Sequence, residues 1–290
     1  MLEMPKLQCC HQYRNFRMYT LSPVGLRRRT LLQSGSALLI PFSSWVAAQP
    51  KASMTLSVAI NRAGKMRALS QRASKAYVQS TLNVLPDKAR DIMLSTQRLI
   101  TGNLDELTAT EPSADVRALL QALGKDSAAL SALTAGTPRK DGLVAVVRAA
   151  DMMLASADRL TKAYEGLSQH GSAKIVNIAG RQRMLSQRAA RAYFLIAAGQ
   201  DTPAFHKQLA VARNEFNQGL ATLQTAPIST PSIRNELELA KSQWTFHEAA
   251  LNKTASAEGL QNVATTSERV FEVMDNLTSM YDAALRDVLG

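Results

Sequence analysis

Residues 177–193 read NIAGRQRMLSQRAARAY, and residues 61–77, 116 positions earlier, read NRAGKMRALSQRASKAY. Eleven of the seventeen positions are identical. A helix that only fills a core repeats its apolar pattern and lets its polar positions drift, but here polar positions recur as well. They are Asn61/Asn177, Arg67/Arg183, Ser70/Ser186, Gln71/Gln187 and Arg72/Arg188. Self-similarity at a long period indicates a repeated structural unit. We interpret the chain as a duplicated helical module in which a set of polar residues with a specific role recurs.

The amino terminus has the pattern of an export signal. Arg27, Arg28 and Arg29 precede a modestly apolar run from Leu31 to Ala48, and Val46-Ala47-Ala48 offers small residues for cleavage. Adjacent arginines before a weakly hydrophobic run resemble a twin-arginine signal. We therefore predict a signal peptide over residues 1–48 and a periplasmic protein. Two alternatives stay open: a basic tail that is not a signal, and a true start at Met18.

Removal of residues 1–48 changes the charge and the cysteine content. The full chain carries +11, and cleavage leaves 28 basic and 22 acidic residues, a net charge of +6. This mild excess does not indicate a nucleic-acid partner, which is typically bound by a clustered basic face. Cys9 and Cys10 are the only cysteines and fall in the removed segment. A cysteine-free mature protein has neither a disulfide nor a thiolate metal site.

From Met54 onward the composition predicts helices throughout, because Ala, Leu, Gln and Ser are abundant and β-branched runs are few. Turn signals divide this part into eight helices; they are Leu85-Pro86-Asp87, Glu111-Pro112-Ser113, Gly136-Thr137-Pro138, Gly166–Ser172, Gly199–Pro203, Ala226–Pro231 and Ser256–Gly259. The predicted fold is all-α, with two tandem antiparallel four-helix bundle modules over residues 52–166 and 172–290. The apolar seam is poorer in the first motif helix, which we expect to be the less buried of the two.

The segment Gly166–Ser172 determines how the modules lie. If it is a turn, both motif helices start at the same end and the modules lie side by side. If it stays helical, the modules stack end to end and the motifs lie far apart. Gly166 and Gly171, with Ser172 as an N-cap, favour the turn.

The motif residues suggest a site for an anion. Gly180, Arg183 and Gln187 share one strip of the helix, with Asn177 and Arg188 on the adjacent strip. A glycine inside a helix costs about 1 kcal/mol relative to alanine, so Gly64 and Gly180 imply a close approach of a backbone or ligand. Neither motif contains an acidic residue. A buried arginine there would need an anion from outside, and its planar fork suits an oxyanion. The structural alternative is a solvated arginine-rich face.

The pattern N-x-A-G-x-x-R-M-L-S-Q-R over Asn177–Arg188 resembles the signature of the PilJ/NarX-type sensor module. That module is the amino-terminal domain of type IV pili methyl-accepting chemotaxis transducers and is related to nitrate/nitrite sensor kinase ectodomains. The resemblance implies a periplasmic four-helix bundle and, in the nitrate sensors, anion binding by the arginine after the glycine. That position is Arg183 here, and Arg67 in the first copy. The first copy departs from the pattern, since Met66-Arg67-Ala68 lacks the Arg-Met doublet.

These observations predict an exported, non-enzymatic binding protein that recognises a small inorganic oxyanion, with nitrate or nitrite the foremost candidates. The expected ligand-binding residues are Arg183, Arg67, Asn177, Asn61, Gly180, Gly64, Arg188 and Arg72. One chain supplies both arginines as a pseudo-dimer, or two chains of a homodimer supply one each. The alternative is a helical adaptor that pairs with a membrane chemoreceptor or type IV pilus component without a small ligand. We expect no cofactor or metal, because the histidines are scattered and no catalytic motif appears.

Overall fold

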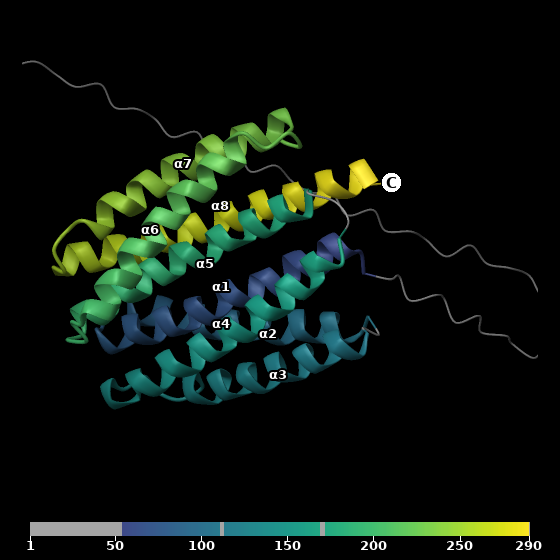
Figure 1. The fold of residues 1–290 in the computed structure, drawn as a ribbon. Helices are drawn as coiled ribbons and strands as arrows, with labels where there is room; N and C mark the ends of the chain where they lie inside the picture. Colours follow the sequence, from purple (N-terminus) through teal and green to yellow (C-terminus); the bar gives the residue numbers. More distant parts are fainter. Residues whose placement is uncertain (1–53, 111–112, 169–171, 290) are drawn as a thin grey trace, which may run out of the picture. The chain divides into compact units, whose positions relative to one another are not determined.

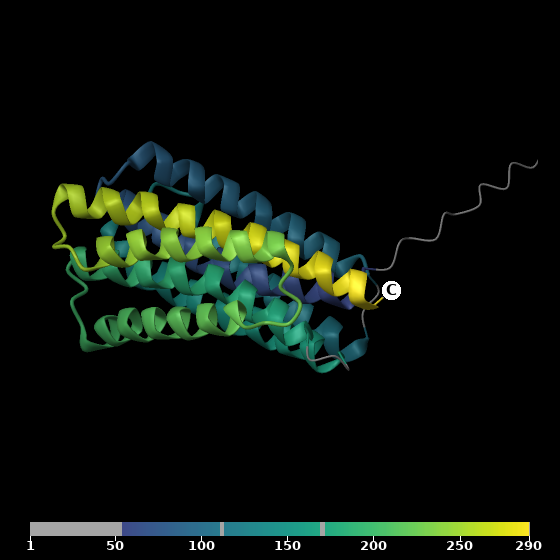
Figure 2. The same cartoon turned by 90° about the horizontal axis from the view of Figure 1, so that it is seen from above.

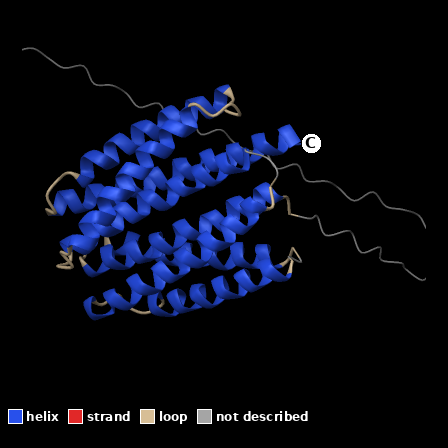
Figure 3. Cartoon of the chain, in the orientation of Figure 1, coloured by secondary structure: helices blue, strands red, loops and turns tan. Residues whose placement is uncertain are grey.

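The computed structural model describes residues 54–110, 113–168 and 172–289, and all regular structure in these ranges is helical (Figure 3). The α-helices are α1 (Leu56–Thr81), α2 (Pro86–Thr108), α3 (Ala114–Thr134), α4 (Leu143–Gly166), α5 (Ser172–Ala197), α6 (Pro203–Gln224), α7 (Pro231–Leu251) and α8 (Ala257–Leu289), with a 3-10 turn η1 at Lys140–Gly142. The predicted all-α class is confirmed. The predicted signal peptide, residues 1–48, lies outside the described residues.

The helices begin where the turn residues predicted. Pro86, Pro203 and Pro231 occupy the first positions of α2, α6 and α7. Proline costs no hydrogen bond there, because the first N–H groups of a helix have no partner within the helix. Ser113, Thr202 and Thr230 cap α3, α6 and α7, because each side-chain oxygen accepts from the backbone N–H three residues on. Helix α4 differs, since it begins only at Leu143, after the turn η1 that follows Pro138.

The two motif helices lie at the centre. Helix α1 packs against α2, α4 and α5, whereas α5 packs against α1, α6 and α8. Both begin at the same end and run side by side (Figures 1 and 2). This is the arrangement expected from a turn between α4 and α5; Leu167 and Ser168 are not helical, and residues 169–171 lie outside the described residues. Because Lys51–Gly290 forms one compact unit, the module boundaries 52–166 and 172–290 stay a prediction.

Burial follows the repeat closely. Within residues 61–77, only Asn61, Arg62, Lys65 and Arg72 are not buried, and the four corresponding positions are the exceptions within residues 177–193. The expectation that the first motif helix is less buried is therefore wrong. It failed because it considered only apolar residues, whereas α1 also buries polar side chains, among them Arg67 and Lys75.

None of the described helices combines the length and the apolar composition that crossing a bilayer requires.

Candidate functional site

Arg67 is buried in α1 and is bound from two sides. Its Nη1 donates to Asp158 Oδ1 of α4 at 3.0 Å, and its Nη2 donates to Asn177 Oδ1 of α5 at 2.6 Å. Its side chain is 2% exposed. Burial lowers the pKa of Arg67 to about 10, although Asp158 opposes this effect. Arg67 therefore stays charged at neutral pH and joins its own helix to two others.

Arg183 in α5 makes the reciprocal contacts. Its Nη1 donates to Asp275 Oδ1 of α8 at 2.5 Å, and its Nη2 donates to Asn61 Oδ1 of α1 at 3.0 Å. Burial lowers the pKa of Arg183 and Asp275 opposes it, as at Arg67. Each motif arginine thus binds the motif asparagine of the other helix and an aspartate from a third helix. The arginines and asparagines predicted as one site come together at the α1–α5 interface.

The glycines make room for the guanidinium groups. A Cβ on Gly180 would lie 3.0 Å from Arg183 Nη2. A Cβ on Gly64 would lie 3.2 Å from Arg67 Nη2 and 3.9 Å from Arg183 Nη2. A terminal nitrogen of each arginine therefore lies within 4 Å of the same point beside Gly64, within one chain. A methyl group at either glycine would crowd a side chain that its ion pair holds in place.

The premise that the arginines lack carboxylates is wrong. Neither motif contains an acidic residue, but Asp158 and Asp275 reach the arginines from α4 and α8, which are 91 and 92 positions away in the chain. An anion from outside is therefore not needed to neutralise Arg67 or Arg183. That the eight predicted residues bind a ligand stays a prediction.

A second pair of buried cations lies two turns further along the motif helices. Lys75 of α1 donates to Glu268 of α8 at 2.6 Å, and Arg191 of α5 donates to Asp151 of α4 at 2.9 Å. Both cationic side chains are 0% exposed. Lys75 and Arg191 correspond in the repeat. If α1–α4 are taken as one half and α5–α8 as the other, each of these cations binds the last helix of the opposite half. With Arg67 and Arg183, which bind the last helix of their own half, they tie α1, α4, α5 and α8 together.

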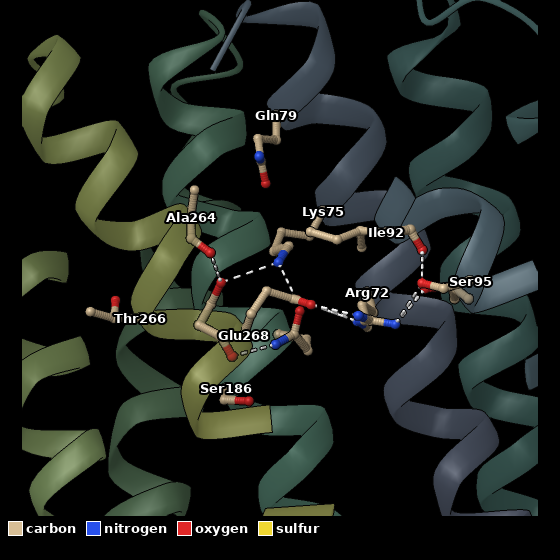
Figure 4. A network of polar contacts seen from close by, with 12 residues as sticks. Arg72, Lys75, Gln79, Ile92, Ser95, Ser186, Ala264, Thr266 and Glu268 are labelled. Carbon is tan, nitrogen blue, oxygen red and sulfur yellow. Dashed lines mark hydrogen bonds and ion pairs between the residues drawn. The ribbon is translucent and has the colours of Figure 1, made fainter. Parts of the chain in front are cut away.

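Glu268 is the most connected acid of this network (Figure 4). Its carboxylate accepts from Lys75 Nζ and also from Arg72 Nη2, at 2.6 Å each. Burial alone would raise the pKa of Glu268, but Lys75 and Arg72 lower it from 4.5 to about 2. Lys75 Nζ donates further to Ser267 Oγ at 3.1 Å. Arg72, predicted as a ligand residue, is thus engaged by Glu268, whereas Nε of its counterpart Arg188 has no partner among the described residues.

The recurrent serines and tyrosines of the motif make corresponding contacts. Ser70 Oγ donates to the carbonyl of Arg67 at 2.8 Å, and Ser186 Oγ donates to that of Arg183 at 2.9 Å. Tyr77 bonds the backbone of Arg139 before α4, and Tyr193 donates to the carbonyls of Lys253 and Thr254 before α8. The tyrosines thus join the motif helices to the segments before α4 and α8. The glutamines differ, since Gln71 donates to Ser70 Oγ whereas Gln187 donates to the carbonyl of Ser267.

Sequence reasoning missed the acidic partners, although the sequence holds a signal for them. Asp151 and Asp158 in α4 recur as Glu268 and Asp275 in α8, each 117 positions later. This offset is one more than that of the motif. A search for charged positions that recur together with the motif would have found all four acids.

The chemistry of the site is that of ion pairing. The pKa values of Asp158, Glu268 and Asp275 are held low by their cationic partners, so these three carboxylates stay ionised near neutral pH. His247 in α7 is buried, and burial together with Lys75 lowers its pKa to about 3. Across the described ranges, no group of three or more His, Cys, Asp or Glu is placed to hold a metal ion.

The fold is a packed helical module in which α1 and α5 are joined by reciprocal arginine–asparagine hydrogen bonds and are ion-paired to α4 and α8. Comparison with known families makes this class more specific. Residues 167–270 match the family model of the type IV pili methyl-accepting chemotaxis transducer N-terminal domain, PilJ. The chain therefore contains a PilJ-type domain that includes α5, α6, α7 and the first part of α8. The match does not extend to residues 52–166, and it does not identify a NarX-type module. No curated protein and no solved structure matches the chain.

Proposed function

We propose that this chain is a non-enzymatic, sensory-type module that pairs with a membrane chemoreceptor or a type IV pilus signalling component. The PilJ-type domain at residues 167–270 supports this role. The reciprocal contacts of Arg67 with Asn177 and of Arg183 with Asn61 support a first module of the same kind over residues 52–166. The two modules form a pseudo-dimer within one chain. The basic and apolar pattern of residues 27–48 supports export to the periplasm.

The observation that carries the adaptor form of this proposal is the pairing of the motif arginines. Asp158 and Asp275 already accept from Arg67 and Arg183, and Asn61 and Asn177 accept from their other terminal nitrogens. Breaking a buried ion pair by removing one partner typically costs about 3–5 kcal/mol. A monovalent anion would have to displace a carboxylate that is covalently part of the fold. We therefore infer that the arginines hold the modules together.

Nitrate or nitrite binding is the second candidate, and one observation favours it. The tips of Arg67 and Arg183 converge beside Gly64, so an anion at that point would meet two guanidinium groups. It ranks below the adaptor because both groups are already neutralised.

Two measurements separate the candidates. In the first, the melting temperature of the chain is recorded in nitrate, nitrite, chlorate, sulfate and chloride at equal ionic strength. A ligand at a hundred times its Kd stabilises a protein by about 2.7 kcal/mol, which raises Tm by several degrees. We expect nitrate and nitrite to act like chloride. A specific rise with nitrate would overturn the adaptor reading in favour of the anion sensor.

The second measurement is direct capture. The purified extracytoplasmic domain of a type IV pilus chemoreceptor from the same organism is immobilised, and the purified chain is passed over it. Saturable binding is expected. Absence of binding to this domain and to purified pilus signalling components, in a chain shown to be folded by circular dichroism, would refute the proposal.

A further inference from the structure

Two grooves occupy corresponding places on either side of the central helices. One lies between α4 and the start of α6, beside the end of α5, and has a volume of about 640 Å³. The other lies between α2 and α8, beside α1, and has a volume of about 610 Å³. Both volumes are within the range of small-molecule sites, which is about 300–1,000 Å³. The two grooves differ in what lines them.

The groove beside α5 is apolar. Val144, Val147 and Met152 line it from α4, and Leu195 and Phe205 line it from α5 and α6. Val144 is 69% exposed and Met152 is 50% exposed, so the surface available to a ligand is largely hydrocarbon. Covering apolar surface of this kind with an apolar body is favourable, because both surfaces are removed from water.

The two charged residues that line this groove differ, because one is paired within the fold and the other is not. Asp151 lines it, but its carboxylate is neutralised by the buried Arg191 at 2.9 Å. Arg148 also lines it and makes no hydrogen bond or ion pair with any residue in the described part of the chain. The groove therefore offers one free guanidinium beside hydrocarbon walls. A ligand that complements both features has an apolar body and one negatively charged head.

We propose that the groove between α4 and α6 binds a free anionic amphiphile, a medium-length aliphatic or aromatic carboxylate or sulfonate. The apolar body lies against Val144, Val147 and Phe205, and the head accepts from Arg148. This proposal rests on the proposed pairing with a signalling component. It adds to the adaptor, which was expected to have no small ligand, a ligand site away from the motif arginines. The bound molecule also contacts Asp151, the acid that links α4 to Arg191 of α5. The proposed ligand therefore lies beside an ion pair that joins α4 to α5.

The groove beside α1 serves as the internal control. It is lined by charged side chains that include Lys88, Arg98 and Glu272, and Leu94, which is 49% exposed, also lines it. Seven of its eleven lining residues are charged, against two of ten in the groove beside α5, so an apolar body is less well matched there. A substitution made there tests whether binding is specific to the other groove.

Calorimetric titration of the full chain with decanoate and with decanol, both below their aggregation concentrations, tests the proposal. We expect saturable binding of decanoate at one site, with decanol bound more weakly. Arg148→Gln should weaken decanoate about tenfold, since a charge-assisted hydrogen bond is lost, and should leave decanol unchanged. Val144→Asp places a carboxylate in the groove at an exposed position and should abolish decanoate binding. Leu94→Asp, the matched change at the other groove, should alter neither ligand.

Three outcomes would overturn the proposal. They are no saturable decanoate binding by the native chain, equal loss in Val144→Asp and Leu94→Asp, and binding that requires vesicles of anionic lipid. Circular dichroism establishes that each variant is folded. Failure here leaves capture by the chemoreceptor domain intact, whereas loss of capture with decanoate still bound would refute the proposed function instead.

Discussion

Replacing Glu268 with Gln isolates the contribution of the buried charge network to stability. The substitution keeps the size of the side chain but removes the negative charge that faces Lys75 and Arg72. The Glu268 side chain is 13% exposed and that of Lys75 is 0% exposed, so water replaces little of the lost interaction. Lys75 would be left as an uncompensated cation among packed helices.

The size of the effect follows from the ionisation of Glu268. Its pKa is lowered from 4.5 to about 2, which corresponds to roughly 3 kcal/mol at about 1.4 kcal/mol per tenfold change in the equilibrium. Breaking a buried pair from one side typically costs about 3–5 kcal/mol, which agrees. In a protein of this size about 3 kcal/mol lowers Tm by roughly 6–12 °C. Urea unfolding at pH 7, followed by circular dichroism, measures the loss directly.

Two controls show whether the buried charge is the cause. Asp141→Asn breaks the exposed pair in which the Arg139 side chain is 75% and the Asp141 side chain 68% exposed, and it should leave the free energy of unfolding nearly unchanged because water and salt screen the pair. Lys75→Met combined with Glu268→Gln removes the stranded ammonium and should recover more than half of the loss. The reasoning fails if the free energy of unfolding of Glu268→Gln is within about 0.5 kcal/mol of that of the native chain. It also fails if the double variant is no more stable than the single one.

Two further predictions concern pH and the motif glycines. Because the folded-state pKa of Glu268 is lowered to about 2, its stabilisation is complete above its ordinary value of 4.5 and is lost as the pH falls towards 2. Urea unfolding at pH 5 and pH 3 should show this loss, and Glu268→Gln should show less of it; an identical pH dependence in both proteins would contradict the assignment. Gly102→Ala in α2, where a Cβ meets nothing within 4 Å, should stabilise the chain by about 1 kcal/mol. Gly180→Ala should lose that gain or reverse it, because its Cβ lies 3.0 Å from Arg183 Nη2; equal stabilisation at both positions, measured by thermal unfolding, would show that Arg183 is free to move.

Local sequence signals predicted the helices because helix ends depend on neighbouring residues. Pro86, Pro203 and Pro231 mark helix starts through their fixed φ and missing N–H, wherever the rest of the chain lies. The start of α4 was displaced to Leu143 because the chain after Pro138 forms the turn η1, which no strong local signal specifies. The pairing of α1 with α5 was expected from the repeat together with the turn before Ser172.

The chemistry of the site was only partly accessible, because its charge balance is non-local. The motif predicted that Arg67, Arg183, Asn61 and Asn177 belong together, and their contacts agree. It did not reveal Asp158 and Asp275, since ion-pair partners are chosen by helix packing and not by spacing along one helix. Lys75 and Arg191 were overlooked because Lys and Arg are not identical in the two copies, although both are buried cations.

The presence of α1–α4 and α5–α8 in one chain has a consequence for how the two grooves can differ. A symmetric homodimer encodes both of its equivalent surfaces in a single stretch of sequence, so any change appears in both. In this chain the surface beside α5 and the surface beside α1 are encoded separately. Substitutions can therefore adapt one surface to hydrocarbon and leave the other charged, while the shared ion pairs between the halves stay intact.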